Sequence, residues 1–541
     1  MKRTLLLLSM ALSACLFLNA QQRSQEEVRD IAHIFYNNVY GHTASTRAEE
    51  SLELIPSSRL LSLDAAEEIF YLCNSQQDGY VLVSADMRMP ELLGYSDRSY
   101  DADKGLPPAL LEVMSGYAAL VDEPVVTRAT SADVTPLIQT RWNQDDPFNR
   151  MCPRDGGKRS VTGCAATAAA QILKYYEWPK ETSKQTISYR TFRKDIAVKI
   201  NLEDYSFAWD LMRDEYIPNL YTNAQANAVA KLMFAVGAAC ETDYASTESS
   251  SSLYNCMLAM VKYFGYDKDM CLLTAGHFSA EGWEEMLQRE IYERRPVMMG
   301  ASSTNVGKLS GHAFLLDGYQ QKGNYVYYHV NWGWGGDGDG YYRINNFTPK
   351  DEATNDMGMG TFTTNQIILI NFQPDDGKDN TIYALLEKMD LIRSDEADDL
   401  QFKLKVRELS CIFGITWEGT LCVEFVDENG VAQQPAELGY CSIDPGYYIS
   451  KTYDVRLGPL NEGKYTVRPF LKSKNGRRIE ILSERSLPVL TVSAAQESAI
   501  RDLQQEVLEK QTYDLQGREK KNAGKLPAGF YIVNGKKVVL F

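Results

Sequence analysis

The stretch that decides the fold runs from residue 160 to 179 and reads SVTGCAATAAAQILKYYEWP. Its alanine-rich middle favours a helix that begins near Cys164 and ends at the Trp-Pro step of residues 178–179. Unpaired N–H groups and the positive end of the helix dipole converge at a helix N-terminus, and both favour thiolate over thiol. Gly163 allows a tight turn before the helix, and Thr162 is expected to cap it. The pattern predicts that Cys164 is an activated nucleophile rather than a small buried hydrophobic residue.

A thiol nucleophile needs a base, and the chain contains five histidines. Two of them precede a polar stretch, residues 125–136, that is typical of an exposed and cleavable connector. His277 lies in a polar loop, and His329 lies inside a strand-like run where a structural role is favoured. His312 begins an apolar strand between two small residues, which leave room for a substrate. His312 is therefore the predicted base.

Two further motifs supply the groups that such a pair requires. YHVNWGWGG, residues 328–336, places Asn331 at the end of a strand, where an amide can orient the imidazole and Trp332 can shield their hydrogen bond from water. WNQDDPFNRMCP places Gln144 twenty residues before Cys164. A glutamine side chain and the Cys164 N–H would together hold the oxyanion of an acyl transfer. The order Cys, His, Asn predicts a thiol hydrolase.

Composition excludes several other classes. The chain has 541 residues, of which 44% are hydrophobic and 24% charged, as in ordinary soluble multidomain proteins. A net charge of −16 disfavours nucleic acid or anionic lipid as the main partner. The ten cysteines are irregularly spaced, without a C-x-x-C pair or zinc-ligand spacing, so neither a disulfide scaffold nor a metal site is expected. No cofactor is predicted.

The N-terminus, MKRTLLLLSMALSACLFLNAQQ, combines a basic start with a short apolar run and a small residue, Ala20. This pattern predicts an export signal cleaved after Ala20. The run Leu-Ser-Ala-Cys ending at Cys15 leaves lipoprotein anchoring through Cys15 as an alternative. No other run reaches the roughly 18 apolar residues of a membrane-spanning helix.

The residue composition and the hydrophobic pattern change several times along the chain. After a signal peptide at residues 1–20, a mixed block at 21–128 ends in the polar connector, and the block 129–374 carries every motif above. Helices come first in that block and aromatic strands later, which predicts an α+β, two-lobed domain. Alternating runs separated by turns predict a β-sandwich of the immunoglobulin-like kind at 375–495. Residues 496–541 suggest a small terminal β unit, which could serve as a sorting signal.

Four blocks in this order resemble the streptopain family of bacterial cysteine peptidases: WNQDDPFNRMCP, TGCAATAAAQILKYYEWP, GHAFLLDGY and HVNWGWGGDGDGYYRI. The resemblance spans roughly residues 21–372 and implies a papain-like fold with a prodomain that blocks the cleft. It implies that Cys164 is the nucleophile and His312 the base, that Gln144 lies in the oxyanion hole, and that Asn331 and Trp332 lie behind the histidine.

The same resemblance implies that Gly311 and a serine near residue 250, taken as Ser250, bind the substrate backbone. The region around Ser250 is serine-rich here, whereas the family usually has a glycine-rich loop. The tail YDLQGR…GFYIVNGKK resembles C-terminal segments of exported Bacteroidetes proteins.

These observations predict an exported endopeptidase made as a zymogen, with protein or peptide substrates and its own prodomain as an intramolecular inhibitor. The resemblance implies action on unfolded or host proteins, with a hydrophobic preference at the second residue before the cut. Two other functions stay open at this point. One is a thiol acyl-transferase of the transglutaminase kind, because the same triad chemistry serves both. The other is a catalytically silent family member that acts as a binding protein.

Overall fold

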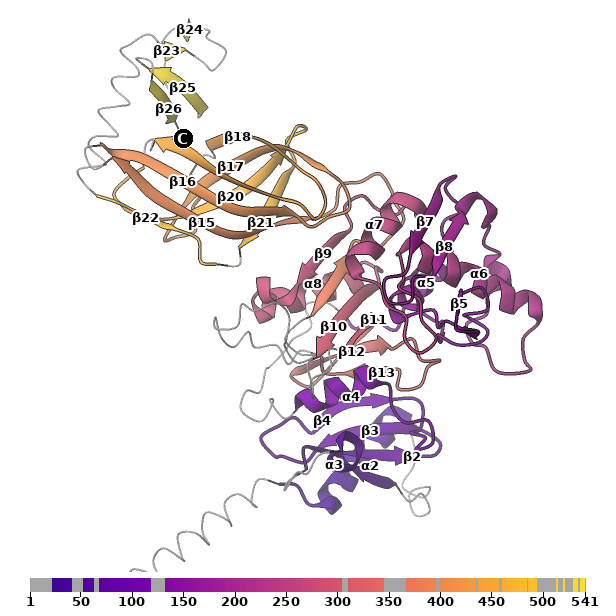
Figure 1. Ribbon diagram of the computed structural model, residues 1–541. Helices are drawn as coiled ribbons and strands as arrows, with labels where there is room; N and C mark the ends of the chain where they lie inside the picture. Colours follow the sequence, from indigo (N-terminus) through magenta and orange to yellow (C-terminus); the bar gives the residue numbers. More distant parts are fainter. Residues whose placement is uncertain are drawn as a thin grey trace, which may run out of the picture. The chain divides into compact units, whose positions relative to one another are not determined.

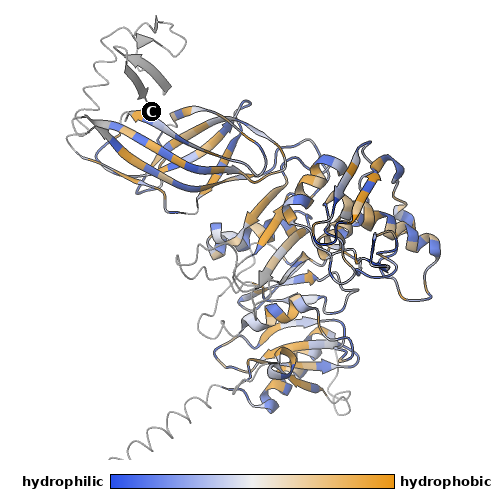
Figure 2. Cartoon of the chain, viewed as in Figure 1, coloured by the Kyte–Doolittle hydropathy of each residue, from blue (hydrophilic) through white to orange (hydrophobic). Residues whose placement is uncertain are grey.

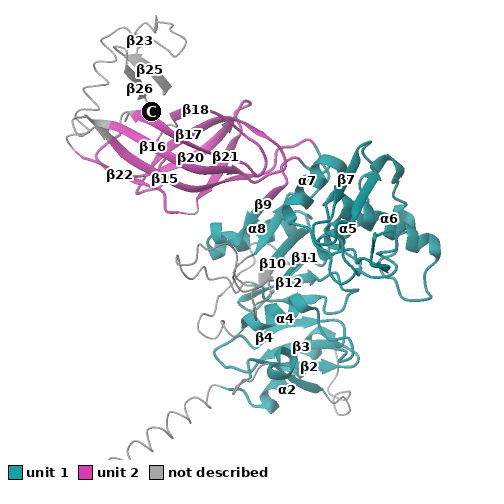
Figure 3. Cartoon of the chain, in the orientation of Figure 1, with its two compact units in different colours: residues 1–267, 272–376 teal, residues 268–271, 377–541 magenta. Residues whose placement is uncertain are grey.

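The computed structural model (Figure 1) describes residues 22–40, 52–62, 68–117, 132–303, 310–344, 366–395, 398–433, 436–456, 460–483 and 485–493, and the strand segments 512–513, 519–520, 529–533 and 536–540. The expected signal peptide and most of the connector therefore lie outside the described residues. Within these ranges, no helix has the length and apolar character needed to cross a membrane. The chain divides into two compact units, residues 1–267 with 272–376 and residues 268–271 with 377–541 (Figure 3).

The first unit opens with a small helix-on-sheet layer. Helix α2 (Gln25–Tyr40) places one apolar face on the sheet strands that follow it. The buried core of this layer joins α2 residues, Val28 and Phe35 among them, to strand residues such as Val81. The remaining elements of the layer are β1 (Glu53–Pro56), α3 (Ser57–Leu61), β2 (Phe70–Ser75), β3 (Gly79–Ser84), β4 (Leu92–Ser96) and α4 (Pro108–Ser115).

The helices of residues 132–303 are α5 (Cys164–Tyr176), α6 (Asn223–Ala239), α7 (Leu253–Phe264) and α8 (Ala280–Tyr292). Nine residues of α5, from Ala165 to Leu173, are buried. The helix can be enclosed this fully because most of these side chains are alanine, which lets α6 and α7 approach closely. Two small hairpins, β5–β6 (Arg154–Asp155, Lys158–Arg159) and β7–β8 (Thr186–Arg190, Ala197–Asn201), lie beside this helical layer.

A ten-stranded sheet runs through the whole first unit in the order β1-β2-β3-β4-β13-β12-β11-β10-β14-β9. Its later strands are β9 (Cys271–Thr274), β10 (Val297–Ser303), β11 (Ser310–Lys322), β12 (Tyr325–Asn331), β13 (Gly340–Tyr342) and β14 (Ile367–Ile370). Helices therefore precede the main strands along the chain, as the sequence predicts. The sheet supplies both His312 and Asn331, whereas α5 supplies Cys164.

The N-terminal layer and the later strands share one sheet because β4 pairs with β13. Tyr95 pairs with Tyr341, and Gly94 pairs with Tyr342. Glycine is required on both sides of this joint: a Cβ on Gly340 would lie 2.2 Å from the Tyr95 carbonyl oxygen, and one on Gly94 would lie 2.4 Å from the Tyr342 ring. The N-terminal block therefore continues the hydrogen-bonded sheet of the main domain.

The second unit, for which the sequence predicts a β-sandwich, is built from strands. Eight strands form one continuous sheet in the order β18-β17-β20-β21-β15-β16-β19, with β22 paired to β20. Polar and apolar residues alternate along them (Figure 2), for example in β18, so that each strand buries one face. The strands are β15 (Tyr383–Asp395), β16 (Asp398–Cys411), β17 (Trp417–Asp427), β18 (Ala436–Ile443), β19 (Tyr448–Arg456), β20 (Gly463–Ser473), β21 (Arg478–Ser483) and β22 (Val489–Val492).

The terminal region carries a separate four-stranded sheet in the order β24-β23-β25-β26. Its strands are β23 (Thr512–Tyr513), β24 (Glu519–Lys520), β25 (Gly529–Val533) and β26 (Lys536–Leu540). Strands β25 and β26 pair antiparallel, with Val533 opposite Lys536, in the region for which the sequence predicts a small β unit.

Candidate active site

Cys164 is the first residue of α5, and it is partly buried. The residue before the helix is Gly163, with φ of 88°, a conformation that favours glycine. A Cβ there would lie 2.8 Å from the carbonyl oxygen of Ser249, so the segment before Ser250 approaches the helix start directly. The expected cap by Thr162 is wrong: its hydroxyl contacts that of Thr167 at 2.8 Å, and no side chain caps the helix. The uncapped N-terminus leaves N–H groups available beside the sulfur.

His312 lies near the start of β11, opposite Ala301 of β10. Its imidazole forms a hydrogen bond with the Cys164 thiol, so α5 and the sheet bring the two predicted partners together. The Nε2 atom lies 2.9 Å from the carbonyl oxygen of Trp332. Because a carbonyl only accepts, Nε2 carries a proton, and Nδ1 is the nitrogen left for the sulfur.

The two groups shift each other's pKa in opposite directions. Burial raises the pKa of the Cys164 thiol, but the charge and hydrogen bond of His312 outweigh burial, and the pKa falls below its ordinary value. Burial lowers the pKa of His312, but the Cys164 sulfur and the Trp332 carbonyl outweigh it, and the pKa rises. Both shifts favour a thiolate–imidazolium pair, the reactive form of a cysteine nucleophile.

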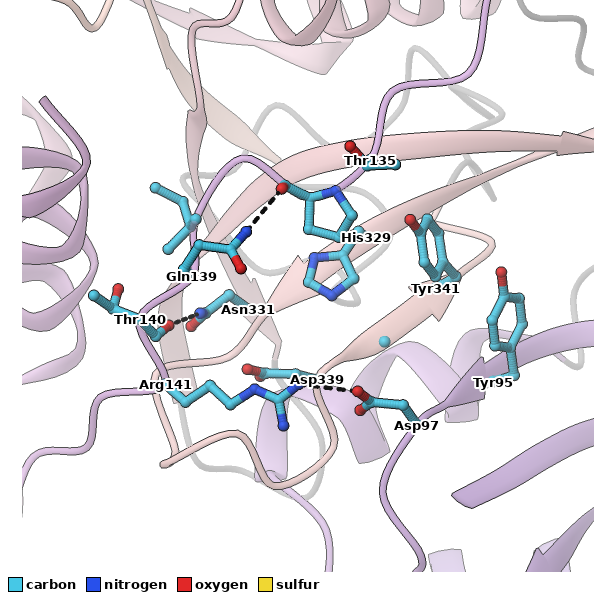
Figure 4. Close-up of a pocket in the computed structure, with 13 residues that line it drawn as sticks. Tyr95, Asp97, Thr135, Gln139, Thr140, Arg141, His329, Asn331, Asp339 and Tyr341 are labelled. Atoms are coloured by element: carbon cyan, nitrogen blue, oxygen red, sulfur yellow. Dashed lines mark hydrogen bonds and ion pairs between the residues drawn. The ribbon is translucent and has the colours of Figure 1, made fainter. Parts of the chain in front are cut away.

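The backbone of Trp332, rather than the side chain of Asn331, orients the histidine. Among the described residues, no hydrogen bond joins the Asn331 amide to His312. Instead, Asn331 Oδ1 accepts from Gly333 N at 3.0 Å, and Asn331 Nδ2 donates to the Thr140 carbonyl at 2.7 Å, a bond that Figure 4 also shows. Asn331 thus fixes the turn that presents the Trp332 carbonyl.

Trp332 is fully buried and helps to hold the same turn. Its indole Nε1 donates to the Gly338 carbonyl at 2.9 Å, and its ring lies 4.8 Å from that of Phe314. Its backbone N–H donates to Asp339 Oδ1 at 2.9 Å. Burial raises the pKa of Asp339 to about 7. The loop from Trp332 to Asp339 is therefore fastened at both ends behind the imidazole.

Gln144 lies close to the nucleophile along the backbone. Its carbonyl accepts a hydrogen bond from Thr162 N at 3.1 Å, which places the two chains side by side just before Cys164. Its own N–H donates to Asn143 Oδ1 at 2.7 Å. Gln144 and Cys164 therefore lie on neighbouring segments of the backbone.

The two predicted substrate-binding residues lie next to residues that neighbour the pair: Gly311 precedes His312, and Ser250 follows Ser249, which approaches Gly163. Gly311 is exposed and precedes His312, and a Cβ there would have only the Ala301 carbonyl within 4 Å, at 3.8 Å. Ser250 is exposed, and its hydroxyl accepts a hydrogen bond from Arg193 at 3.4 Å. The buried serine of this segment is Ser249, whose hydroxyl bonds both backbone groups of Ala245.

Beside the turn lies a cavity of about 330 Å³, drawn in Figure 4. The lining includes Tyr95 and Asp97 of the N-terminal layer together with Arg141, His329 and Asp339 of the main domain, and Asp97 pairs with Arg141 at 2.9 Å. The structural role expected for His329 agrees with its position, because its Nδ1 lies 2.6 Å from the buried carboxylate of Asp317. The described residues contain no group of side chains suited to hold a metal ion.

Sequence reasoning missed one buried residue beside this site, Gln171 of α5. Its side chain contacts Asn331, Thr140 and Trp142. The available signal is its position in the sequence: a polar residue in an alanine-rich helix, two turns after Cys164 and on the same face.

Comparisons with known proteins agree with this geometry. The sequence matches the model of the peptidase C10 family over residues 142–342 and that of the Spi protease inhibitor over residues 20–119. Streptopain of Streptococcus pyogenes serotype M1 is 29% identical over 381 residues, which cover 65% of this chain and 92% of streptopain. The thiol protease/hemagglutinin PrtT of Porphyromonas gingivalis is 26% identical over 437 residues, covering 75% of this chain and 48% of PrtT.

Among solved structures, a prointerpain A fragment from Prevotella intermedia is 28% identical with a TM-score of 0.50, and the match covers 61% of this chain and 100% of the fragment. The predicted α+β peptidase fold with a preceding prodomain is thereby confirmed. The chain belongs to the peptidase C10 family: it is a cysteine endopeptidase of the streptopain kind, whose catalytic domain follows an inhibitor-like prodomain as in a zymogen.

Proposed function

We propose that Cys164 is the nucleophile of this peptidase and that His312 is its general base and acid. The observation that carries the assignment is the hydrogen-bonded contact between the two side chains, with a lowered pKa for the thiol and a raised pKa for the imidazole. The position of Cys164 at an uncapped helix N-terminus adds to the preference for thiolate.

In the proposed reaction, the Cys164 thiolate attacks the carbonyl carbon of a peptide bond. The oxyanion accepts hydrogen bonds from the Cys164 N–H and the Gln144 side chain. The imidazolium of His312 then protonates the leaving amine as the C–N bond breaks, which leaves an acyl-enzyme. A water molecule, deprotonated by neutral His312, hydrolyses the thioester and restores the ion pair.

The supporting groups have narrower roles in this proposal. The Trp332 carbonyl keeps the imidazole oriented during both proton transfers, and Asn331 holds the turn that carries this carbonyl. Gly311 and Ser250 are proposed to contact the backbone of an extended protein substrate. Support for Gly311 is its exposure beside His312, and support for Ser250 is its place after Ser249, which packs on Gly163.

The proposed life history follows from the chain's organisation. Residues 1–20 would direct export, with lipidation of Cys15 as the alternative to cleavage after Ala20. Removal of residues 21–128 would produce the mature enzyme, and the polar connector is the proposed cleavage region. Residues 375–495 would anchor or present the catalytic domain, and residues 496–541 could sort it to the cell surface. Support for export is the basic start, short apolar run and small Ala20 of the N-terminus.

Selective alkylation tests the nucleophile assignment. The self-processed enzyme, treated with limiting iodoacetamide at about pH 6, should be modified at Cys164 before the other cysteines, because its pKa is lowered whereas burial raises the pKa of Cys152, Cys411 and Cys422 to about 12. Peptide mapping would locate the label, and casein digestion should fall in proportion to it. Labelling of another cysteine with parallel loss of digestion would contradict the assignment.

The thiolate–imidazolium pair also determines how activity and alkylation depend on pH. The thiolate persists below the ordinary cysteine pKa, because the folded pKa is lowered, and the imidazolium persists above the ordinary histidine pKa, because the folded pKa is raised. The charged pair therefore exists over a pH interval that is widened at both ends, because the thiolate extends below the ordinary cysteine value of 9.0 and the imidazolium extends above the ordinary histidine value of 6.5. Casein digestion and alkylation should accordingly be maintained across this interval, with loss of alkylation only at lower pH.

The prodomain is held to the loop behind His312 by polar contacts. Arg98 pairs with Glu215 and donates to the Gly335 carbonyl at 2.9 Å, and Ser96 donates to the Asp339 carbonyl at 2.5 Å. Arg98→Ala should therefore loosen the prodomain and speed self-processing by about 2- to 5-fold, the effect of a partly exposed ion pair worth about 0.5–1 kcal/mol. Gel analysis over time would measure the rate. Arg59→Ala, on the short helix α3, is the matched control and should process at the wild-type rate.

A further inference from the structure

Gln171 occupies a fully buried position on α5, seven residues after Cys164. Seven residues are about two helical turns, so the two side chains leave the helix on the same side. An uncharged but strongly polar side chain in this position must find hydrogen-bond partners, because burial without them is costly.

The partners of Gln171 come from two other segments of the active site. Its Oε1 accepts from Thr140 Oγ1 at 3.0 Å and from Trp142 N at 3.2 Å, both on the segment that leads to Gln144, and from Asn331 Nδ2 at 3.3 Å. Its Nε2 donates to Asn331 Oδ1 at 3.0 Å. Asn331 in turn donates to the Thr140 carbonyl at 2.7 Å, the bond drawn in Figure 4. Gln171, Thr140 and Asn331 are thereby joined in a closed circuit of hydrogen bonds. Three segments that are distant in sequence thus meet at one amide.

The direction of every bond in this circuit is fixed by backbone groups. Trp142 N can only donate, so the glutamine atom that faces it must be the oxygen, and the amide nitrogen must face Asn331. Gly333 N can only donate, so the Asn331 atom that faces it must also be the oxygen. The Thr140 carbonyl can only accept, which agrees with Asn331 Nδ2 as its donor. Each amide therefore has one orientation that satisfies all partners.

We propose that Gln171 is a positioning residue for catalysis, which sets the oxyanion loop and the histidine-orienting turn relative to the nucleophile helix. Through Trp142 it holds the loop of Gln144, and through Asn331 it holds the turn of the Trp332 carbonyl. This inference rests on the proposed roles of Cys164 and His312. It predicts that damage to Gln171 changes the chemistry of the site and not only the stability of the fold, since small displacements of reacting groups cost large factors in rate.

Gln171→Glu is the most informative variant because it preserves shape and keeps an oxygen for Thr140 and Trp142. It removes the donor to Asn331, so an ionised glutamate would face the Asn331 oxygen. We expect kcat to fall about 10- to 100-fold at pH 8 with little change in KM. Burial favours the protonated acid, whose O–H restores the missing donor. The ratio of variant to wild-type kcat should therefore rise as the pH falls toward 5.

The measurement uses mature enzyme prepared from the full chain. Tagged wild-type enzyme would process each variant zymogen and then be removed by its tag, and iodoacetamide titration would count active sites. The pH midpoint of Cys164 alkylation should move upward in Gln171→Glu, because a displaced imidazole stabilises the thiolate less. Ile172→Val, the buried neighbour on the same helix, is the control: its melting temperature should fall, with kcat and the alkylation midpoint unchanged.

Thr140→Val provides a second measurement if Gln171→Glu does not fold. It removes one bond of the circuit without changing shape, and kcat should fall about 2- to 5-fold with KM unchanged. The inference would be overturned if Gln171→Glu had the same kcat and the same alkylation midpoint as the wild type. If Gln171→Glu does not fold, the same result for Thr140→Val would overturn it. Casein digestion by Cys164→Ala would instead overturn the proposed function, so the two failures are distinguishable.

Discussion

Cys164→Ala should fold normally and should neither digest casein nor process itself. Alanine fits the start of α5, whose following residues are already alanine, so the packing around the helix is preserved. The variant lacks the only sulfur in contact with His312 among the described residues, and no acyl-enzyme can form. Loss of a nucleophile of this kind costs about 10⁴-fold or more in kcat. Wild type and variant, both expressed from residue 21, would be followed by gel for size and by casein digestion for activity.

Wild type is expected to shorten itself by some 108 residues, the length of the segment from 21 to 128. The matched control is Cys441→Ala, which removes a buried cysteine of the second unit and should behave as wild type in both assays. Equal shortening of wild type and Cys164→Ala would mean that another protease performs the maturation. Equal casein digestion would end the assignment of Cys164.

His312→Ala is the second change with a large expected effect. It removes the base and also the positive charge that lowers the pKa of the Cys164 thiol. With burial then unopposed by the imidazole, the thiol pKa should rise, and alkylation of Cys164 by iodoacetamide near pH 6 should become slow. Casein digestion should fall by about 10³-fold or more, since both proton transfers lose their carrier.

The two readouts together separate a catalytic role from a structural one. His277→Asn, in the short helix of residues 275–277, is the control and should retain both rapid alkylation and digestion. A His312→Ala enzyme that is inactive yet alkylated as fast as wild type would show that the imidazole does not stabilise the thiolate. That result would contradict the ion pair on which the mechanism depends.

The sequence signals for the proposed reactive pair are local. The Gly-Cys step and the alanine run that follows it indicate Cys164. His312 is indicated because few other histidines of the chain have a suitable sequence context. The prediction for Asn331 was harder, since the group that meets the imidazole is the carbonyl of Trp332. Every residue carries a carbonyl, so no sequence pattern marks the one that a turn will present.

The remaining differences have the same physical origin in long-range packing. Threonine is a residue type that often caps helices, but the Thr162 hydroxyl forms a hydrogen bond with the Thr167 hydroxyl and does not cap the helix. In the sequence Gln171 looks like an ordinary helix residue, because its partners Thr140 and Asn331 are distant in the chain and meet it only in the fold. The pairing of β4 with β13 joins residues about 245 positions apart and depends on two glycines that allow close approach.

Because the prodomain shares a sheet with the catalytic domain, cleavage of the connector and release of the prodomain are two separate events. Cutting the connector breaks a peptide bond but leaves the ladder between β4 and β13, and the contacts of Arg98, in place. What the cut removes is the tether, so the local concentration of the pro-segment drops from millimolar to that of the bulk solution. Onset of activity should thus lag behind cleavage at high protein concentration and shorten on dilution. Secretion into a large volume would itself complete the activation.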